Sequence, residues 1–125
     1  MGDAVQAISD QAAIGDVVED YVVGAALGQI DRLARALHPR FQTAGQYRGA
    51  ETWLDRDAAL AMARSAEGRT AANLRWSVMS LDVVGNTAVA RVVSGEPGAE
   101  FDELLSFLRD GGRWRIVFKT FHIAG

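Results

Sequence analysis

The feature that most constrains the fold is a change of hydrophobic period near the middle of the chain. In the first third, apolar residues recur every three or four positions, which is typical of amphipathic helices. After a polar loop over 67–73, the apolar residues form short runs separated by turns that contain glycine. Helices followed by consecutive strands predict an α+β arrangement. The 125 residues fit one domain spanning 1–125, with no repeat and no linker.

Three helices are predicted in the first half. Gly24 and Gly28 weaken the first near its end, and Pro39 ends the second, because the residue before a proline avoids the α region. Residues 41–48 are expected to be extended, and Asp55 is the expected N-cap of the third helix. The apolar stripe of the first helix consists of Ile14, Val17, Val18, Tyr21, Val22 and Ala25, extended backwards by Ile8 and Ala12.

Four strands are predicted in the second half, over 74–84, 86–95, 99–109 and 112–123. The turns between them are short, at Gly85-Asn86, at 95–98 and at 110–112, so consecutive strands should form antiparallel hairpins. The last strand is expected to place Trp114, Ile116, Phe118, Thr120 and His122 on one face and Val117, Phe121 and Ile123 on the other.

Both faces of this sheet are therefore apolar, whereas an antiparallel sheet with one wet face alternates between apolar and polar residues. Three helices cover only one face of a strongly curved sheet. We expect the other face to meet a second copy of the chain in a homodimer. The alternative is a monomer in which twist and bulges blur the alternation.

Composition excludes several classes of protein. The net charge is -3, without the basic surplus of a nucleic-acid binder, so no nucleic-acid partner is expected. The absence of cysteine excludes disulfides and thiol chemistry. No basic leader and no apolar run of about 18 residues is present, so we expect no membrane partner and a cytoplasmic location. The two histidines, His38 and His122, have no ligand spacing, and no phosphate-binding glycine loop occurs, so neither a metal nor a cofactor is expected.

Five segments carry a resemblance to a known family: DYVVG at 20–24, DRLARALHP at 31–39, LDVVGNTA at 81–88, FDELLSFLR at 101–109 and GRWRIVFKTFH at 112–122. Together they resemble the nuclear-transport-factor-2-like superfamily, and within it the SnoaL-like branch called "putative lumazine-binding". The resemblance implies a conical α+β fold in which three N-terminal helices pack on a curved, mainly antiparallel sheet and enclose a pocket. It also implies that the convex faces of two sheets pair. Members include isomerases, dehydratases, cyclases and many proteins without a known reaction, so the fold does not select a function.

Three residues are candidates for catalysis. Tyr21, reaching into a cone from the first helix, would donate its hydroxyl to a carbonyl or a developing oxyanion. Asp102 and Glu103 are neighbours on a strand and point to opposite faces; the resemblance favours Asp102 as the carboxylate that enters the cone and moves a proton. His122 would act as acid, base or hydrogen-bond donor if its face lines the cone. Each also has a purely structural interpretation, as a core tyrosine, an exposed carboxylate and a histidine at a strand end.

Four further residues are candidates for ligand binding. Trp53 and Trp76 offer walls for a planar molecule, and Phe118 lies on the face assigned to His122. Arg91, in phase with two valines, would clamp an anion or pair with a carboxylate. Aromatic side chains of this kind also occur as plain core residues, and the arginine as a charge at the sheet edge.

These candidates support three hypotheses. The first is a homodimeric domain whose cone binds a small apolar or planar molecule. The second is a cofactor-independent isomerase, dehydratase or cyclase in which Asp102 or His122 moves a proton and Tyr21 stabilises the enolate. The third is a non-catalytic dimerisation module whose cone is filled by its own side chains.

Overall fold

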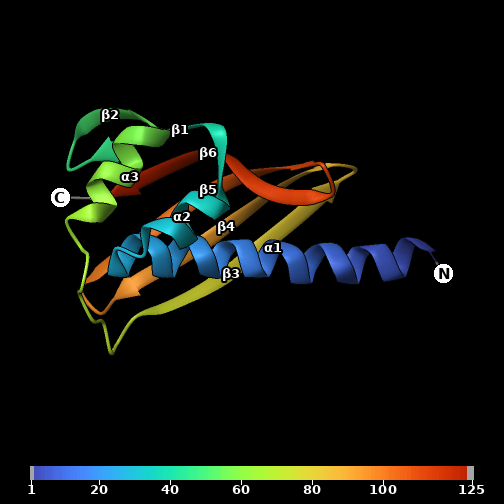
Figure 1. The fold of residues 1–125 in the computed structure, drawn as a ribbon, viewed down its shortest axis with the longest axis horizontal. Helices are drawn as coiled ribbons and strands as arrows, with labels where there is room; N and C mark the ends of the chain where they lie inside the picture. The colour runs from blue at the N-terminus through green and yellow to red at the C-terminus, as the bar shows by residue number, and fades with distance from the viewer. Residues whose placement is uncertain (1, 124–125) are drawn as a thin grey trace.

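The computed structural model describes residues 2–123, over which three helices and six strands form one layered domain (Figure 1). The helices are α1 (Gly2–Leu27), α2 (Ile30–Ala36) and α3 (Arg56–Arg64), and the strands are β1 (Leu37–Tyr47), β2 (Ala50–Asp55), β3 (Arg75–Val84), β4 (Thr87–Glu96), β5 (Ala99–Asp110) and β6 (Arg113–Ile123).

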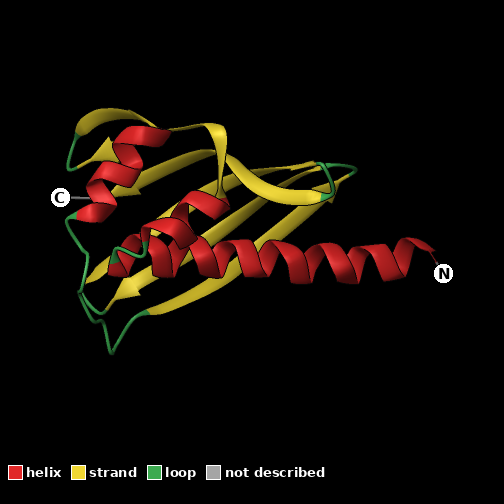
Figure 2. Ribbon diagram, in the orientation of Figure 1, coloured by secondary structure: helices red, strands yellow, loops and turns green. Residues whose placement is uncertain are grey.

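The strands form a single sheet in the order β2-β1-β6-β5-β4-β3. The pair β1–β6 is parallel and every other pair is antiparallel. The helices lie on one face of this sheet, which we call the helix-covered face, and leave the opposite outer face bare (Figures 1 and 2). The prediction of an α+β domain with a mainly antiparallel sheet is confirmed, and each of the four predicted strands is matched to within one residue at both ends.

The strands β1 and β2 were predicted less well. β1 begins at Leu37 rather than at 41 and runs through Pro39. The pairing of β1 with β6 is irregular between Leu37 and Gln42, so Pro39, which has no backbone N–H, is not needed as a donor in a regular ladder. The short edge strand β2 was missed because its sequence, AETWLD, lacks a β-branched run. Its signal is the preceding turn at Arg48-Gly49, where both residues have positive φ (51° and 83°), as a type I′ hairpin requires.

The helix α1 supplies the central stripe of the core. Ile14, Val18 and Val22 are buried as expected, but Ile8 is 68% exposed. The expected extension of the stripe through Ile8 and Ala12 is wrong, because the first turns of α1 project past the end of the sheet (Figure 1).

The two junctions at the ends of the helices follow the sequence closely. Gly28 adopts φ +64°, and the amide of Gln29 donates to the carbonyl of Gly24 at 3.0 Å, which is the hydrogen bond of a Schellman motif. The expected N-cap is confirmed, since the Asp55 carboxylate accepts from the Ala58 amide at 2.9 Å.

A β-bulge in β6 decides which side chains face the helices. Ile116 pairs with Phe107 but Phe118 pairs with Ser106, so one extra residue sits between them and inverts the alternation. Trp114 and Ile116 lie on the helix-covered face before the bulge, whereas Lys119 and Phe121 lie on it afterwards. The expected grouping of Phe118, Thr120 and His122 with Trp114 and Ile116 is therefore wrong.

Candidate functional site

Three ionisable side chains meet under α1: Tyr21 from α1, Glu103 from β5 and Lys119 from β6. The Tyr21 hydroxyl donates to both carboxylate oxygens of Glu103, at 2.9 Å each. The Lys119 ammonium lies 3.0 Å from the Tyr21 oxygen and 3.0 Å from Oε2 of Glu103. Tyr21 and Glu103 are only 7% and 4% exposed, while the Lys119 side chain is 19% exposed and forms the accessible edge of the cluster.

Each member of the cluster is placed by a local feature of the sequence. The helical stripe aligns Tyr21 with Val18, and strand alternation aligns Glu103 with the buried Leu105. Lys119 would point to the outer face in a regular strand, and the bulge turns it toward the helices. The bulge therefore completes the cluster.

The surroundings fix the protonation states of Tyr21 and Lys119. Burial raises the pKa of the Tyr21 phenol well above its usual value, and the nearby charge of Glu103 raises it further, so the hydroxyl stays a donor. Burial alone would lower the pKa of Lys119, but Tyr21 and Glu103 outweigh it and the pKa is raised. The side chain is therefore an ammonium and a hydrogen-bond donor rather than an amine nucleophile. Its Nζ also lies 5.4 Å from the Tyr21 ring centroid and 5.3 Å from that of Phe121.

The prediction that Asp102, rather than Glu103, points toward the helices is wrong. Asp102 is exposed on the outer face, where Arg91 donates to its two oxygens at 2.9 and 2.6 Å. This pairing lowers the pKa of the Asp102 carboxyl and raises that of the Arg91 guanidinium. The two neighbouring acids do point to opposite faces, as expected, but the register of β5 directs Glu103 inward.

Three other predicted site residues lie on the outer face, away from the cluster. His122 is exposed and pairs in register with Asp102, and Phe118 lies on the same side of β6 beyond the bulge. Trp53 is 62% exposed on β2, and its indole donates to Glu51 at 3.0 Å. His122 and Phe118 were expected on the helix-covered face because the prediction assumed that β6 alternates regularly, without a bulge.

Trp76 is the predicted ligand-binding residue that lies on the helix-covered face. It pairs in register with the buried Ser94, and a hollow of about 270 Å³ opens beside both, where β3 begins and β4 ends. Phe101 also pairs with Ser94, so its partly exposed ring lies on this face too. Partly exposed aromatic rings thus flank the end of the sheet on which the cluster lies.

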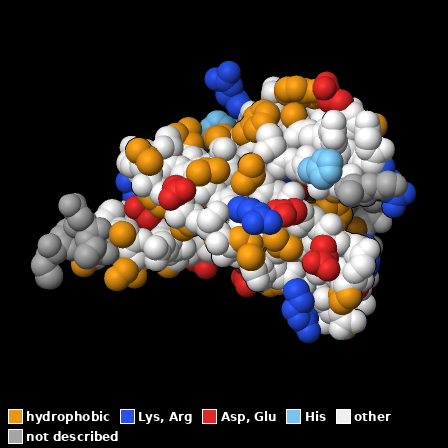
Figure 3. All heavy atoms as spheres, turned by 180° about the vertical axis from the view of Figure 1, so that it is seen from behind, with side chains coloured by type: hydrophobic (Ala, Val, Ile, Leu, Met, Phe, Trp, Pro, Cys, Tyr) orange, Lys and Arg blue, Asp and Glu red, His pale blue; other side chains and the backbone are white. Residues whose placement is uncertain are grey.

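A larger hollow, of about 950 Å³, lies on the outer face between the start of β1 and strands β4 to β6. Phe118, Leu108 and Val89 contribute apolar walls, and His38 and Arg40 of β1 contribute part of the rim. Figure 3, which views the molecule from behind Figure 1, shows hydrophobic side chains spread over this face and interrupted by acidic and basic ones. The exposed apolar residues here include Trp53, Val84, Val89 and Leu104.

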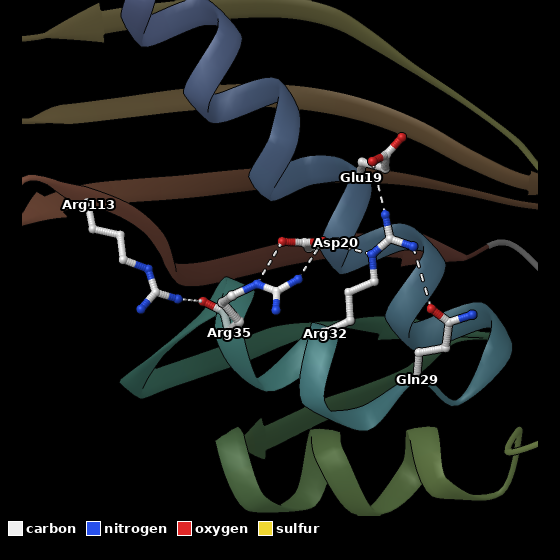
Figure 4. Close-up of polar contacts among 6 residues, drawn as sticks. All are labelled: Glu19, Asp20, Gln29, Arg32, Arg35 and Arg113. Atoms are coloured by element: carbon white, nitrogen blue, oxygen red, sulfur yellow. Dashed lines mark hydrogen bonds and ion pairs between the residues drawn. The ribbon is translucent and has the colours of Figure 1, made fainter.

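Two polar networks hold α1 in the position that the cluster requires. At one end, the buried Asp10 accepts from Nε1 of Trp114 at 3.2 Å and from Arg109 at 3.0 Å. At the other end, Asp20 accepts from Arg32 at 2.7 Å and from Arg35 at 3.2 Å, which joins α1 to α2 (Figure 4).

The same figure shows Arg113 at the start of β6 donating to the backbone carbonyl of Arg35, at 2.7 Å. Burial would raise the pKa of Asp20, but the hydrogen bonds from Arg32 and Arg35 outweigh it and lower the pKa. Tyr21 follows Asp20 directly, so this network fixes the rotation of α1 about its axis at the cluster.

Sequence reasoning missed Glu103 and Lys119 as site residues. A usable signal was present, because Lys119 is the only lysine among thirteen basic residues and interrupts an apolar strand. Within the part of the chain that the structure describes, no group of three His, Asp or Glu residues is arranged to hold a metal ion. Among the same residues, no helix combines the length and apolar character needed to cross a bilayer.

The fold is shared with solved structures that are described as nuclear-transport-factor-2-like. A protein of unknown function from Silicibacter pomeroyi DSS-3 is 31% identical, with a TM-score of 0.84 over 92% of this chain and 96% of that one. A second, from Methylobacillus flagellatus KT, is 24% identical, with a TM-score of 0.78 over 94% of both chains. A third, from Novosphingobium aromaticivorans and described as having a cystatin-like fold, is 19% identical, with a TM-score of 0.73 over 98% and 86%.

The family described as "Putative lumazine-binding" matches residues 9–122. The chain belongs to this family, within the nuclear-transport-factor-2-like superfamily, as the sequence segments predicted. A search of curated proteins finds no match.

Proposed function

We propose that this protein is a small-molecule-binding domain whose polar anchor is the Tyr21–Glu103–Lys119 cluster. The observation that carries the proposal is the burial of three ionisable groups, within 3.0 Å of one another, on the helix-covered face. Partly exposed aromatic rings of the same face, Trp76 and Phe101, would form the walls for an apolar or planar ligand.

The free energy needed to bury the charged groups of the cluster supports a functional role. A buried ion pair recovers its desolvation penalty only with excellent geometry, and apolar residues of similar volume are often as stabilising or more so. Perturbed ionisable groups of this kind gather at functional sites.

The bare outer face supports a homodimer as the working form. Trp53, Val84 and Leu104 are 62%, 74% and 50% exposed there, and the helices give them no cover. A two-fold axis over the centre of the sheet would bury these side chains in a self-complementary contact. The Arg91–Asp102 pair on adjacent strands offers both charges to the facing copy.

A second candidate function is cofactor-independent proton transfer, favoured by the carboxylate in the cluster. Glu103 would take a proton from a carbon beside a carbonyl, and the electron pair left behind would move to the carbonyl oxygen. The protonated acid would then return the proton at another carbon, which is an isomerisation. The Lys119 ammonium supplies the positive charge that such an enolate oxygen needs.

The test compares two neighbouring carboxylates on opposite faces. Mass spectrometry of the native protein would identify small molecules that co-purify with it, and Glu103→Gln should weaken their retention. Asp102→Asn is the matched control, because it makes the same chemical change on the outer face and should leave retention intact.

Retention that is unchanged in both Glu103→Gln and Lys119→Met, in folded protein, would contradict the proposed site. If no small molecule co-purifies and none of a chemically diverse set raises the melting temperature, the third hypothesis, a dimerisation module with a filled cone, would be favoured instead.

A further inference from the structure

A buried hydroxyl beside the cluster has no hydrogen-bond partner. Thr43 on β1 is 1% exposed, and its Oγ1 finds no donor or acceptor among the residues that the structure describes. A buried hydroxyl is normally paired, because leaving it unpaired costs the full free energy of desolvation. Thr43 is therefore the polar group on this face that a ligand would satisfy.

Lys119 is the direct neighbour of this hydroxyl. The two residues are register partners on the parallel strands β1 and β6, and both lie on the helix-covered face. Same-face neighbours on adjacent strands have Cβ atoms about 5 Å apart. An ammonium has three N–H donors. Two point to Tyr21 and Glu103, and within residues 5–123 the third has no acceptor.

The charge balance of the cluster decides what kind of acceptor fits. The Glu103 carboxylate lies 3.0 Å from Lys119 and already offsets its positive charge. A ligand carboxylate at the same ammonium would face the like charge of Glu103 in a poorly solvated place. A neutral carbonyl oxygen accepts the same hydrogen bonds without adding a charge.

We infer that the site binds the carbonyl oxygen of a neutral, planar molecule, with the Lys119 ammonium and the Thr43 hydroxyl as the two donors. This inference rests on the proposed binding function and names the chemical class of its ligand. The aromatic ring of Phe121 lies on the same face, with its centroid 5.3 Å from Nζ of Lys119, and would contact the apolar body of the molecule.

Lys119 is the only lysine in the chain, which makes the test specific to one residue. Protein labelled with ¹³Cε,¹⁵Nζ-lysine gives a single side-chain signal in NMR. Three matched probes are titrated: acetophenone, which carries a neutral carbonyl; benzoate, which carries a charge; and ethylbenzene, which has neither. Acetophenone should bind most tightly and shift the lysine signal.

Two variants separate the contributions of the neighbours. Thr43→Val keeps the shape of the side chain and removes the hydroxyl, so acetophenone should bind about threefold to tenfold more weakly. Thr43→Ser retains the hydroxyl and should restore the affinity. Glu103→Gln removes the negative charge that would repel benzoate. The ratio of the affinity for benzoate to the affinity for acetophenone should therefore be higher in this variant than in the unmodified protein.

The outcomes distinguish this inference from the function on which it rests. If ethylbenzene binds as tightly as acetophenone and Thr43→Val changes nothing, the carbonyl site is refuted while the binding domain stands. Tighter binding of benzoate than of acetophenone to the unmodified protein would refute the charge argument. If none of the three probes binds but a compound of the chemically diverse set raises the melting temperature, the carbonyl site is refuted while the proposed function stands.

Discussion

The neighbouring acids Asp102 and Glu103 have opposite environments, because consecutive residues of a strand point to opposite faces of the sheet. Asp102 is paired to Arg91 in solvent, whereas Glu103 is enclosed with Tyr21 and Lys119. Removing one partner of a buried pair leaves the other charge uncompensated. The chemistry of this site therefore depends on the face that a residue occupies, more than on the residue type.

The cluster should make stability sensitive to alkaline pH. In the unfolded chain tyrosine and lysine titrate near pH 10. In the folded chain the pKa values of Tyr21 and Lys119 are both raised, so the folded state holds more protons above about pH 10. The free energy of unfolding, measured with urea, should be constant near neutrality and fall as the pH rises above about 10.

The two tyrosines of the chain provide the control for this effect. Tyr21→Phe removes a titrating group and should make the fall shallower. Tyr47→Phe, at a position that is 46% exposed, should leave it unchanged. Equal slopes for Tyr21→Phe and the unmodified protein would show that the cluster is not linked to folding.

The elements that could be predicted from the sequence are those whose own residues define them, through turn residues and apolar runs. The hairpins of β3 to β6 have turn residues and apolar runs that suffice to define them. The β6 bulge has no comparable signal in the sequence. Both faces of that strand are apolar, so one extra residue does not disturb the pattern of apolar residues along it. Tyr21 could be placed from its helical stripe, whereas Glu103 and Lys119 depend on strand register.

Two glycines of α1 should respond in opposite directions to the same substitution. A Cβ on Gly24 would lie 2.8 Å from the backbone nitrogen of Leu33 in α2, so Gly24→Ala forces the two helices apart. Gly15 has nothing within 4 Å of such a Cβ. Gly15→Ala should stabilise the protein by about 0.5–1 kcal/mol through helix propensity.

Urea unfolding measures both variants. Gly24→Ala should lower the free energy of unfolding by about 1–3 kcal/mol, the usual cost of overpacking. A stabilising Gly24→Ala would mean that α1 and α2 are not in close contact at this point.

For the whole molecule, the outer face is the surface on which the proposed dimer depends. Leu104 lies in its middle, on β5, with Arg91 and Thr120 as register partners on either side. Leu104→Glu places a charge in the proposed dimer contact and should convert the dimer to a monomer in analytical ultracentrifugation. Met62→Glu, at a position on α3 that is 62% exposed, should leave the assembly unchanged.

The unmodified chain sedimenting as a monomer at micromolar concentration would contradict the dimer. An unchanged dimer in Leu104→Glu would contradict its placement on this face. The folded content of the variant, measured by circular dichroism, separates loss of assembly from loss of structure.

The parallel pairing of β1 with β6 has a consequence for how the molecule is made. β6 lies between the hairpin β1–β2 and the meander β3–β5, so the sheet is continuous only when that strand is present. A nascent chain synthesised as far as Asp110 therefore holds two disconnected half-sheets, and the proposed ligand site lacks Lys119. Such long-range closure slows folding and exposes strand edges to other chains. We expect the emerging polypeptide to need shielding by a chaperone until β6 is available.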